Sequence, residues 1–264
     1  MLRTRIILIL ITAAVVAVIF FLPKVVVQNE DELASAQQAD TVAKAHAPVS
    51  QVNQATITRL RHQLETKKNS IFADSLWQLY TGIGKFDSAA WFAEQSATFL
   101  NTTDSYLRAG DSYYEAFSYA LEQEKQAQLG LKAREFFGKA LEANPKLYDA
   151  KAKMAMTFIG GGAPPMQGIR MLREVATEDP TNEFALFSLG TLSIQSTQYD
   201  RAIEWLTKLV EVNPNHLQGQ VFLGVALANA GKKDEARTQF EKARKMTTDP
   251  SVIATIDSYL KDLK

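Results

Sequence analysis

The chain contains no cysteine. Disulfide bonds, thiolate metal sites, cysteine nucleophiles and the lipid-bearing cysteine of a lipoprotein are therefore excluded. An excess of either charge is also missing, because 29 Lys and Arg residues balance 29 Asp and Glu residues. Nothing in this balance predicts a nucleic-acid partner, which requires a basic surface. The 264 residues are 46% hydrophobic, which is ample for a folded core.

Histidine is scarce, with His46, His62 and His216 as its three occurrences. They fall in three separate predicted elements. A metal site, or a Ser-His-Asp arrangement, needs at least one histidine in a pocket where other functional groups converge. The sequence therefore predicts no catalytic residue, no metal ligand and no cofactor, and the chain is not expected to be an enzyme.

One long apolar run is present, at residues 6–22, where Thr12 is the only polar residue. As a helix this run spans roughly 25 Å, near the lower limit for a bilayer. Arg3 and Arg5 precede it, whereas acidic residues follow at 30–32. The positive-inside rule then places the N-terminus in the cytoplasm and the body on the periplasmic, or otherwise extracytoplasmic, side of the plasma membrane. We expect residues 1–22 to form a single-pass anchor.

Two alternatives to this anchor stay open, a cleaved signal peptide and a buried helix of a soluble protein. Signal peptidase requires small residues after the apolar region. Here the run ends in the bulky residues 19–22, and the nearest small-x-small triplet, at residues 34–36, lies beyond the acidic cluster. The uncleaved anchor is therefore favoured.

Residues 23–69 are predicted to form a tether followed by a lead-in helix. The first part, up to about residue 49, is rich in Ala, Gln, Asp and Glu, has no long apolar run, and reads as a tether. From Ser50 onward Val52, Ile57, Leu60 and Leu64 recur at roughly helical spacing. This helix is interpreted as a partly exposed lead-in, with a stalk, a dimer seam or a cap on the following domain as alternatives. A homo-oligomer is not indicated.

Two consecutive 34-residue segments, 183–216 and 217–250, share one pattern of small and large residues. The aligned pairs are Leu189 with Leu223, Gly190 with Gly224, Ala202 with Ala236, and Leu206 with Phe240. Small residues let two helices approach closely, and large residues fill the space between them. Repetition at this period indicates stacked helix pairs, none of which buries its apolar face alone.

This pattern resembles the tetratricopeptide repeat (TPR). The resemblance implies an all-α, right-handed solenoid of about five TPR-like helix pairs over residues 70–264, preceded by one transmembrane helix. The units fall at about 70–103, 104–148, 149–182, 183–216 and 217–250, with a capping helix at 251–263. The first unit departs from the pattern at Trp77, which replaces a small residue. The second carries about eleven extra residues, most simply about three added helical turns divided between its two helices.

The glycine-rich loop at residues 160–165 invites a phosphate-binding interpretation. It lacks the Gly-Lys-Ser/Thr ending and a preceding strand. The better interpretation is that the glycines end one helix and Pro164 with Pro165 starts the next, where proline is tolerated. A recognition edge remains the alternative.

The aromatic-rich stretch at residues 106–119 is interpreted as core packing, with a peptide-facing platform as the alternative. Asp111 and Glu115 lie four residues apart within it. They resemble a carboxylate pair but are interpreted as solvated charges on an exposed helix.

In proteins that the chain resembles, the first helix of each pair lines a concave binding surface. The resemblance gives a binding set of Lys153, Phe184, Phe187, Thr191, Gln195, Gln218, Val221, Val225 and Asn229. This set lacks the basic cluster that grips a C-terminal carboxylate in some members. We expect Phe184, Phe187 and Val221 to receive an apolar or helical segment of another protein. The alternative is that the C-terminal helix or the next unit covers these side chains.

Together these features predict a non-catalytic, membrane-anchored TPR scaffold that binds partner proteins or peptide segments on the extracytoplasmic side. The partner is not identified by the sequence. The alternative function is an adaptor or chaperone subunit of an envelope pathway, such as the TPR subunits that help c-type cytochromes to mature, which the architecture resembles in outline.

Overall fold

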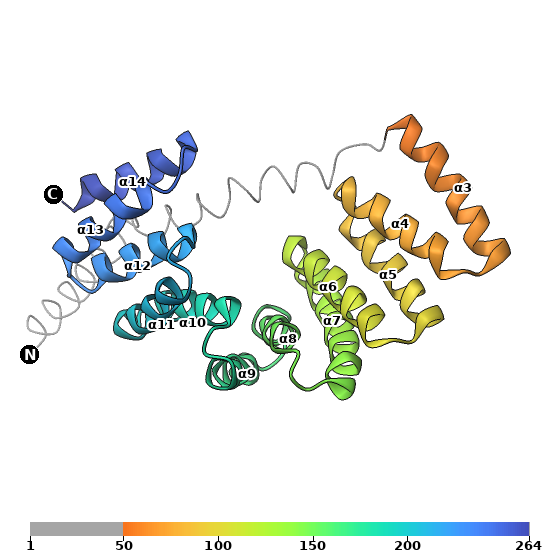
Figure 1. Cartoon of the computed structure of the whole chain (residues 1–264), viewed down its shortest axis with the longest axis horizontal. Helices are drawn as coiled ribbons and strands as arrows, with labels where there is room; N and C mark the ends of the chain where they lie inside the picture. Colours follow the sequence, from red (N-terminus) through yellow and green to blue (C-terminus); the bar gives the residue numbers. More distant parts are fainter. Residues whose placement is uncertain (1–49, 264) are drawn as a thin grey trace, which may run out of the picture. The chain divides into compact units, whose positions relative to one another are not determined.

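The computed structural model describes residues 50–263, and this part of the chain consists of twelve α-helices without a β-strand (Figure 1). The predicted all-α fold is thereby confirmed. The predicted anchor at residues 6–22 and the predicted tether lie outside the described residues. None of the helices between residues 50 and 263 combines the length and the apolar character that a membrane span requires.

The helices follow one another as a lead-in helix, five pairs and a final helix. The lead-in helix is α3 (Gln51–Lys67) and the final helix is α14 (Pro250–Asp262). The five pairs are α4 (Ser70–Gly82) with α5 (Phe86–Leu100), α6 (Thr103–Tyr119) with α7 (Gln123–Ala143), α8 (Tyr148–Gly160) with α9 (Pro165–Glu178), α10 (Glu183–Gln195) with α11 (Tyr199–Val212), and α12 (Leu217–Asn229) with α13 (Lys233–Arg244). We call the first helix of each pair helix A and the second helix B.

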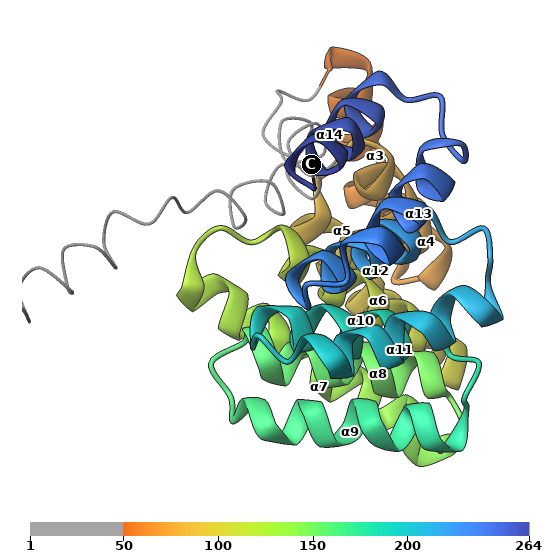
Figure 2. The same ribbon diagram turned by 90° about the vertical axis from the view of Figure 1, so that its left-hand side faces the viewer.

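Each pair packs on the next pair, as expected of a solenoid (Figures 1 and 2). Helix A of each pair has its principal contact with its own helix B, and that helix B contacts helix A of the following pair. In addition, α6 contacts α8, α8 contacts α10 and α10 contacts α12. Between residues 50 and 263, the B helices of successive pairs do not contact one another in this way. The A helices therefore approach one another along one side of the stack and form a continuous layer there.

Within three of the pairs, a glycine of helix A lies directly against a large side chain of helix B. A β-carbon added to these glycines would lie 2.6 to 2.7 Å from the facing side chain, which is shorter than any relaxed contact. The three pairs are Gly110 with Phe137, Gly190 with Leu206, and Gly224 with Phe240. The large side chains are completely buried. Glycine is thus required because the axes of helices A and B come too close for any side chain.

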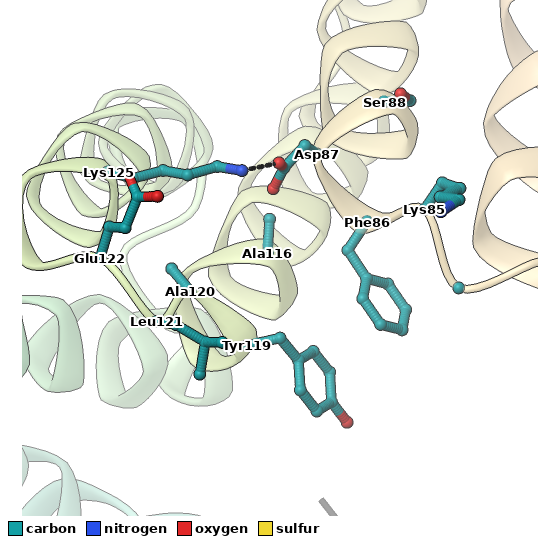
Figure 3. A pocket seen from close by; sticks show the side chains of 11 residues that line it. Lys85, Phe86, Asp87, Ser88, Ala116, Tyr119, Ala120, Leu121, Glu122 and Lys125 are labelled. Carbon is teal, nitrogen blue, oxygen red and sulfur yellow. Dashed lines mark ion pairs between the residues drawn. The ribbon is translucent and has the colours of Figure 1, made fainter. Parts of the chain in front are cut away.

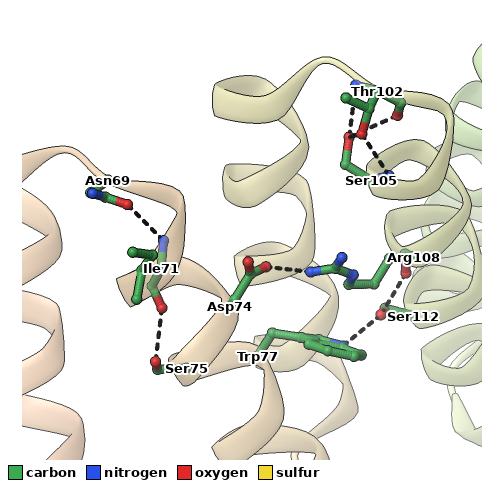
Figure 4. Close-up of polar contacts among 9 residues, drawn as sticks. All are labelled: Asn69, Ile71, Asp74, Ser75, Trp77, Thr102, Ser105, Arg108 and Ser112. Carbon is green, nitrogen blue, oxygen red and sulfur yellow. Dashed lines mark hydrogen bonds and ion pairs between the residues drawn. The ribbon is translucent and has the colours of Figure 1, made fainter.

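The first unit reverses this arrangement. Trp77 occupies the glycine position of helix A, and Ala93 occupies the large position of helix B. Both belong to one hydrophobic cluster, which also includes Phe137 of the next pair. The indole Nε1 of Trp77 donates a hydrogen bond of 3.0 Å to Ser112 Oγ of α6, and Arg108 lies over the indole ring (Figure 4). The tryptophan therefore joins two pairs, which explains why this unit tolerates a residue that the repeat pattern excludes.

The second unit accommodates its extra residues by lengthening both helices. Helices α6 and α7 have 17 and 21 residues, whereas α8 and α9 have 13 and 14. The lengthened α6 and α7 bring Phe117 and Arg134 to the end of α8. The guanidinium of Arg134 donates a hydrogen bond of 2.7 Å to the carbonyl of Thr157 and lies over the ring of Phe158. Because this carbonyl also accepts the backbone N–H of Gly161, Arg134 adds a second hydrogen bond at the C-terminal end of α8.

The glycine-rich loop has the structural role that the sequence favoured. Helix α8 ends at Gly160, and α9 begins at Pro165. A β-carbon at Gly160 would lie 2.9 Å from the ring of Phe117, and Gly162 has a φ of +70°. The first glycine therefore makes room for a ring, and the second adopts a backbone conformation that other residues rarely adopt.

Both ends of the stack are covered by an additional helix. At the first end, Arg61 of α3 donates a hydrogen bond of 2.7 Å to the hydroxyl of Tyr80, and Ile57 is buried against the first pair. At the other end, Tyr259 of α14 stacks on Phe240 with a ring-centre distance of 5.0 Å. Solenoids require such terminal elements because their end units otherwise expose apolar faces.

The glycine contact makes a direct prediction for stability. Gly224→Ala is expected to destabilise the fold by about 1–3 kcal/mol, because the added methyl group must displace the buried Phe240 ring. Gly138 of α7 provides the control, since a β-carbon there meets no atom within 4 Å. Gly138→Ala is expected to stabilise the chain by up to about 1 kcal/mol, through higher helix propensity. Urea unfolding followed by circular dichroism measures both changes, and equal effects of the two substitutions would contradict the packing account.

Candidate functional site

The layer of A helices carries most of the residues that the sequence assigned to binding. We define the A-helix surface as the accessible side chains that α6, α8, α10 and α12 present at the equivalent repeat positions. These are Asp111, Tyr114 and Glu115 on α6, Lys153 on α8, Phe184, Phe187, Thr191 and Gln195 on α10, and Gln218 and Asn229 on α12. Each of them is exposed or half-buried. The surface is therefore mixed, with charges towards α6 and α8 and uncharged side chains towards α10 and α12.

Phe184 and Phe187 are half-buried and make contacts between units. The ring of Phe184 meets Tyr114 of α6 edge-to-face, with ring centres 6.1 Å apart. The ring of Phe187 meets Phe222 of α12 in the same way at 5.4 Å, and His216 lies at 5.4 Å on another side. The next unit thus covers part of Phe187, as one of the sequence alternatives proposed, whereas Phe184 is partly covered by a residue two units earlier. Both phenylalanines remain half-buried.

Val221 and Val225 do not lie on the accessible surface. Each is only 2% exposed, so their predicted placement in an open groove is corrected. Helix α12 contacts α10, α11 and α13, and eight of its 13 residues are buried. A helix covered on several sides buries residues that a more open unit would expose. Among the predicted residues of α12, only Gln218 and Asn229 are therefore accessible.

The remaining predicted residues of α10 and α12 are polar and uncharged. Gln195 and Gln218 are exposed. The Thr191 hydroxyl donates a hydrogen bond of 3.1 Å to the carbonyl of Phe187, and the Asn229 amide donates one of 3.0 Å to the carbonyl of Val225. The two glutamines are thus free to turn towards a bound chain, whereas Thr191 and Asn229 are held to their own helix.

The charged part of the surface is organised by an ion pair between two units. The Lys153 ammonium of α8 lies 2.7 Å from a carboxylate oxygen of Asp111 on α6. Glu115 follows Asp111 by one helical turn, and no ion pair of Glu115 occurs among residues 50–263. Burial raises the pKa of Glu115, the nearby charge of Asp111 raises it further, and Lys153 opposes both effects. This carboxyl group therefore ionises less readily than an exposed glutamate.

A second ion pair joins the A helices α4 and α6. The guanidinium of Arg108 lies 2.5 Å from Asp74, beside the Trp77 contact (Figure 4). Arg108 and Lys153 are thus both held by carboxylates of the neighbouring unit. This arrangement joins the A helices and engages both cations within the stack.

Sequence reasoning missed Asp111, Tyr114 and Glu115 as members of the surface. It interpreted the carboxylates as solvated charges and the tyrosine as core. Tyr114 is half-buried, and burial raises the pKa of its hydroxyl. Alignment of the repeats identifies them. When the second unit is aligned with the fourth, these three residues match Thr191, Ile194 and Gln195.

A small cavity of about 210 Å³ lies outside the A-helix surface, between the start of α5 and the turn after α6 (Figure 3). Phe86 and Tyr119 stack at its floor with ring centres 4.7 Å apart, and Lys125 pairs with Asp87 at its rim. Leu121, also at the rim, is 75% exposed. The sequence did not predict this cavity, and its paired charges specify no particular ligand.

The histidines are dispersed, as far as the structure describes them. His62 is exposed on α3. The Nδ1 atom of His216 accepts a hydrogen bond of 2.9 Å from the backbone N–H of Gly219 and so begins α12. His46 lies outside the described residues. Across residues 50–263, no three His, Asp or Glu side chains are grouped so that they could hold a metal ion.

Comparisons with known proteins agree with this architecture. A family model described as tetratricopeptide repeat matches residues 185–216, which form most of the fourth unit. A crystal structure of MamA shares 19% identity, covers 65% of this chain and 94% of its own, and superimposes with a TM-score of 0.51. MamA from Desulfovibrio magneticus RS-1, residues 41 to the end, shares 16% identity, covers 67% and 94%, and also has a TM-score of 0.51. None of the curated protein sequences matches the chain. These similarities show a TPR-like helical solenoid.

The surroundings of Glu115 predict how stability depends on pH. In the folded chain the pKa of Glu115 is raised, whereas in the unfolded chain it is about 4.3. The free energy of unfolding therefore falls as the pH rises above about 4.3, because ionisation of Glu115 favours the unfolded chain. Glu115→Gln removes this ionisation. The variant is therefore expected to melt at a higher temperature than the wild-type chain at pH 7.

The difference in melting temperature between Glu115→Gln and wild-type protein is expected to disappear as the pH is lowered below about 4.3, where the wild-type carboxyl is also neutral. Glu204→Gln on α11, where the carboxylate is exposed, is the control and is expected to have little effect at any pH. Thermal melts between pH 4 and pH 7 measure the difference. A lower melting temperature for Glu115→Gln at pH 7 would show that the charge stabilises the fold.

Proposed function

We propose that the chain is a non-catalytic scaffold that holds segments of partner proteins against its A-helix surface. The carrying observation is that the stack leaves Phe184, Phe187 and two glutamines accessible along one continuous layer of helices. Large aromatic rings with one covered and one accessible side supply apolar area at low entropic cost. Side-chain amides beside them supply hydrogen bonds that select the orientation of a bound chain.

The rigidity of the stack supports this proposal. The A helices are held by interdigitated cores, and the Phe187 ring is fixed by Phe222 and His216 before any partner arrives. Ordering of side chains on binding is a major cost of association. A surface that is ordered in advance binds a segment with less of this cost.

The charges of the surface favour an internal segment of the partner over a free C-terminus. A terminal carboxylate needs cations that are available to it. Lys153 is engaged by Asp111, and α10 and α12 carry no Lys or Arg on the A-helix surface. We therefore propose that recognition uses the side chains of the partner segment.

The proposal includes attachment to the plasma membrane through residues 6–22, with the helical body on the extracytoplasmic side. The apolar run, the two arginines before it and the acidic residues after it support this placement. The tether of residues 23–49 would allow the body to reach partners near the membrane surface. Tethering also raises the effective concentration of the body near partners in the same membrane.

Blocking the surface tests the binding role. Gln195→Trp combined with Gln218→Trp places bulk on two exposed positions, and crosslinking in membranes is expected to recover the partners at least about tenfold less efficiently. The control is Glu204→Trp with Glu211→Trp, on the exposed side of α11. Equal recovery with both double variants would contradict binding at the A-helix surface.

The partners recovered with wild-type protein distinguish between three forms of the proposed binding function. Precursors of haem proteins would indicate a role in c-type cytochrome maturation. One fixed complex would indicate a structural scaffold, and many unfolded proteins a chaperone.

Protease accessibility tests the proposed location. In spheroplasts, added protease is expected to degrade the helical body while cytoplasmic markers stay intact, because the body lies outside the plasma membrane. Degradation of the body only after the cytoplasm has been opened would contradict the outward orientation. Extraction with alkaline carbonate provides the control for attachment, since an integral anchor keeps the full chain in the membrane pellet.

A further inference from the structure

The charged end of the A-helix surface has more negative than positive groups. Tyr114 and Glu115 lie three and four residues after Asp111, so each of them neighbours Asp111 on the surface of α6. Lys153 is the only cation of the A-helix surface as defined by the described residues. Since its ammonium pairs with Asp111 at 2.7 Å, the charge of Glu115 is not matched by an ion pair.

No other cation on α6 is free to compensate Glu115. Arg108 lies on the same helix, but its guanidinium is held at 2.5 Å by Asp74 of α4. It also lies over the Trp77 ring, with 5.1 Å between the guanidinium carbon and the ring centre. Both nearby cations, Arg108 and Lys153, therefore form ion pairs between A helices, and Glu115 has no ion pair of its own.

The unmatched carboxylate is not well solvated either. Glu115 is half-buried, and burial is the largest of the causes that raise its pKa. A half-buried carboxylate that forms no ion pair of its own destabilises a fold when burial outweighs the nearby positive charge. Stability alone therefore favours a neutral residue here, whereas a cation supplied by a bound partner would make the carboxylate favourable.

Aromatic rings belong to the same part of the A-helix surface. Tyr114 precedes Glu115 in α6, and its half-buried ring meets Phe184 of α10 edge-to-face at 6.1 Å. Guanidinium groups bind carboxylates through paired hydrogen bonds and also stack on aromatic rings. This segment of α6 offers two carboxylates and, three residues from Asp111, a tyrosine ring. It therefore matches arginine in both respects, and lysine in charge.

We propose that the segment bound at the A-helix surface is basic at one end, and that an arginine or lysine of this segment docks on Glu115 and Asp111 beside the Tyr114 ring. The uncharged remainder of the segment lies towards Phe184, Phe187 and the glutamines of α10 and α12. This inference rests on the proposed function and adds the chemistry of the partner. Charge complementarity carries it, since the charged end of the surface has two carboxylates and one lysine.

Selection of peptides from a random heptapeptide phage library tests the inference directly. The full chain is displayed in lipid nanodiscs, so that no truncated protein is needed. Wild-type protein is expected to enrich peptides with arginine or lysine at one end and apolar residues at the other. A selected peptide, made synthetically, is expected to bind Glu115→Gln about tenfold more weakly, because a hydrogen-bonded ion pair is lost.

Two further variants complete the design. Glu204→Gln on α11 makes the same chemical change on an exposed helix B and is expected to bind the selected peptide with wild-type affinity. Glu115→Arg reverses the charge and is expected to shift selection away from basic peptides. Binding by wild-type protein is also expected to weaken as salt is raised from about 0.05 to 0.5 M, because salt screens accessible ion pairs.

The outcomes separate this inference from the function on which it rests. Enrichment of acidic or uncharged peptides, or equal affinity of wild-type and Glu115→Gln protein for a basic peptide, would overturn the basic-partner inference and leave the binding surface standing. Failure of wild-type protein to enrich any peptide would contradict the proposed function, and the inference with it. Because Glu115→Gln is expected to be more stable than wild-type protein, weaker binding by this variant is not explained by unfolding.

Discussion

The fold depends on the close approach of the two helices within each pair. Where helix A has a glycine, a completely buried side chain of helix B fills the space against its backbone, as Phe240 does at Gly224. This contact fixes the distance between the helices and limits their crossing angle. The same contact occurs in the second, fourth and fifth units. Even the first unit obeys the constraint, because Trp77 and Ala93 exchange the large and small positions.

The A-helix surface is a consequence of the stacking of these pairs. The adjacent helices α6 and α8 place Lys153 against Asp111. The side chains of Phe184 on α10 and Tyr114 on α6 meet although α8 lies between these helices in the order of the stack. These contacts stabilise the stack and at the same time orient the accessible parts of the same side chains. Glu115 is different, because no contact of the stack uses its charge. Residues that disfavour the fold and lack a structural partner are where function is to be sought.

The repeat pattern predicted the helices well because the residues that define it are the packing residues themselves. It failed for Val221 and Val225, since their burial depends on how many neighbours α12 has, which no single unit encodes. It also passed over Tyr114 and Glu115, because the aromatic residues around Tyr114 suggested core packing and the carboxylates suggested solvated charges. The membrane anchor, predicted from residues 6–22, remains a prediction outside the described part of the chain.

Photo-crosslinking from single positions tests the central claim, that the A-helix surface is where partners bind. A benzophenone amino acid would replace exposed Gln195 of α10 in one full-length variant and exposed Glu204 of α11 in another, each expressed in cells. Our account predicts discrete protein adducts from position 195 and none of these from position 204. The same adducts from both positions, or adducts from position 204 alone, would contradict it.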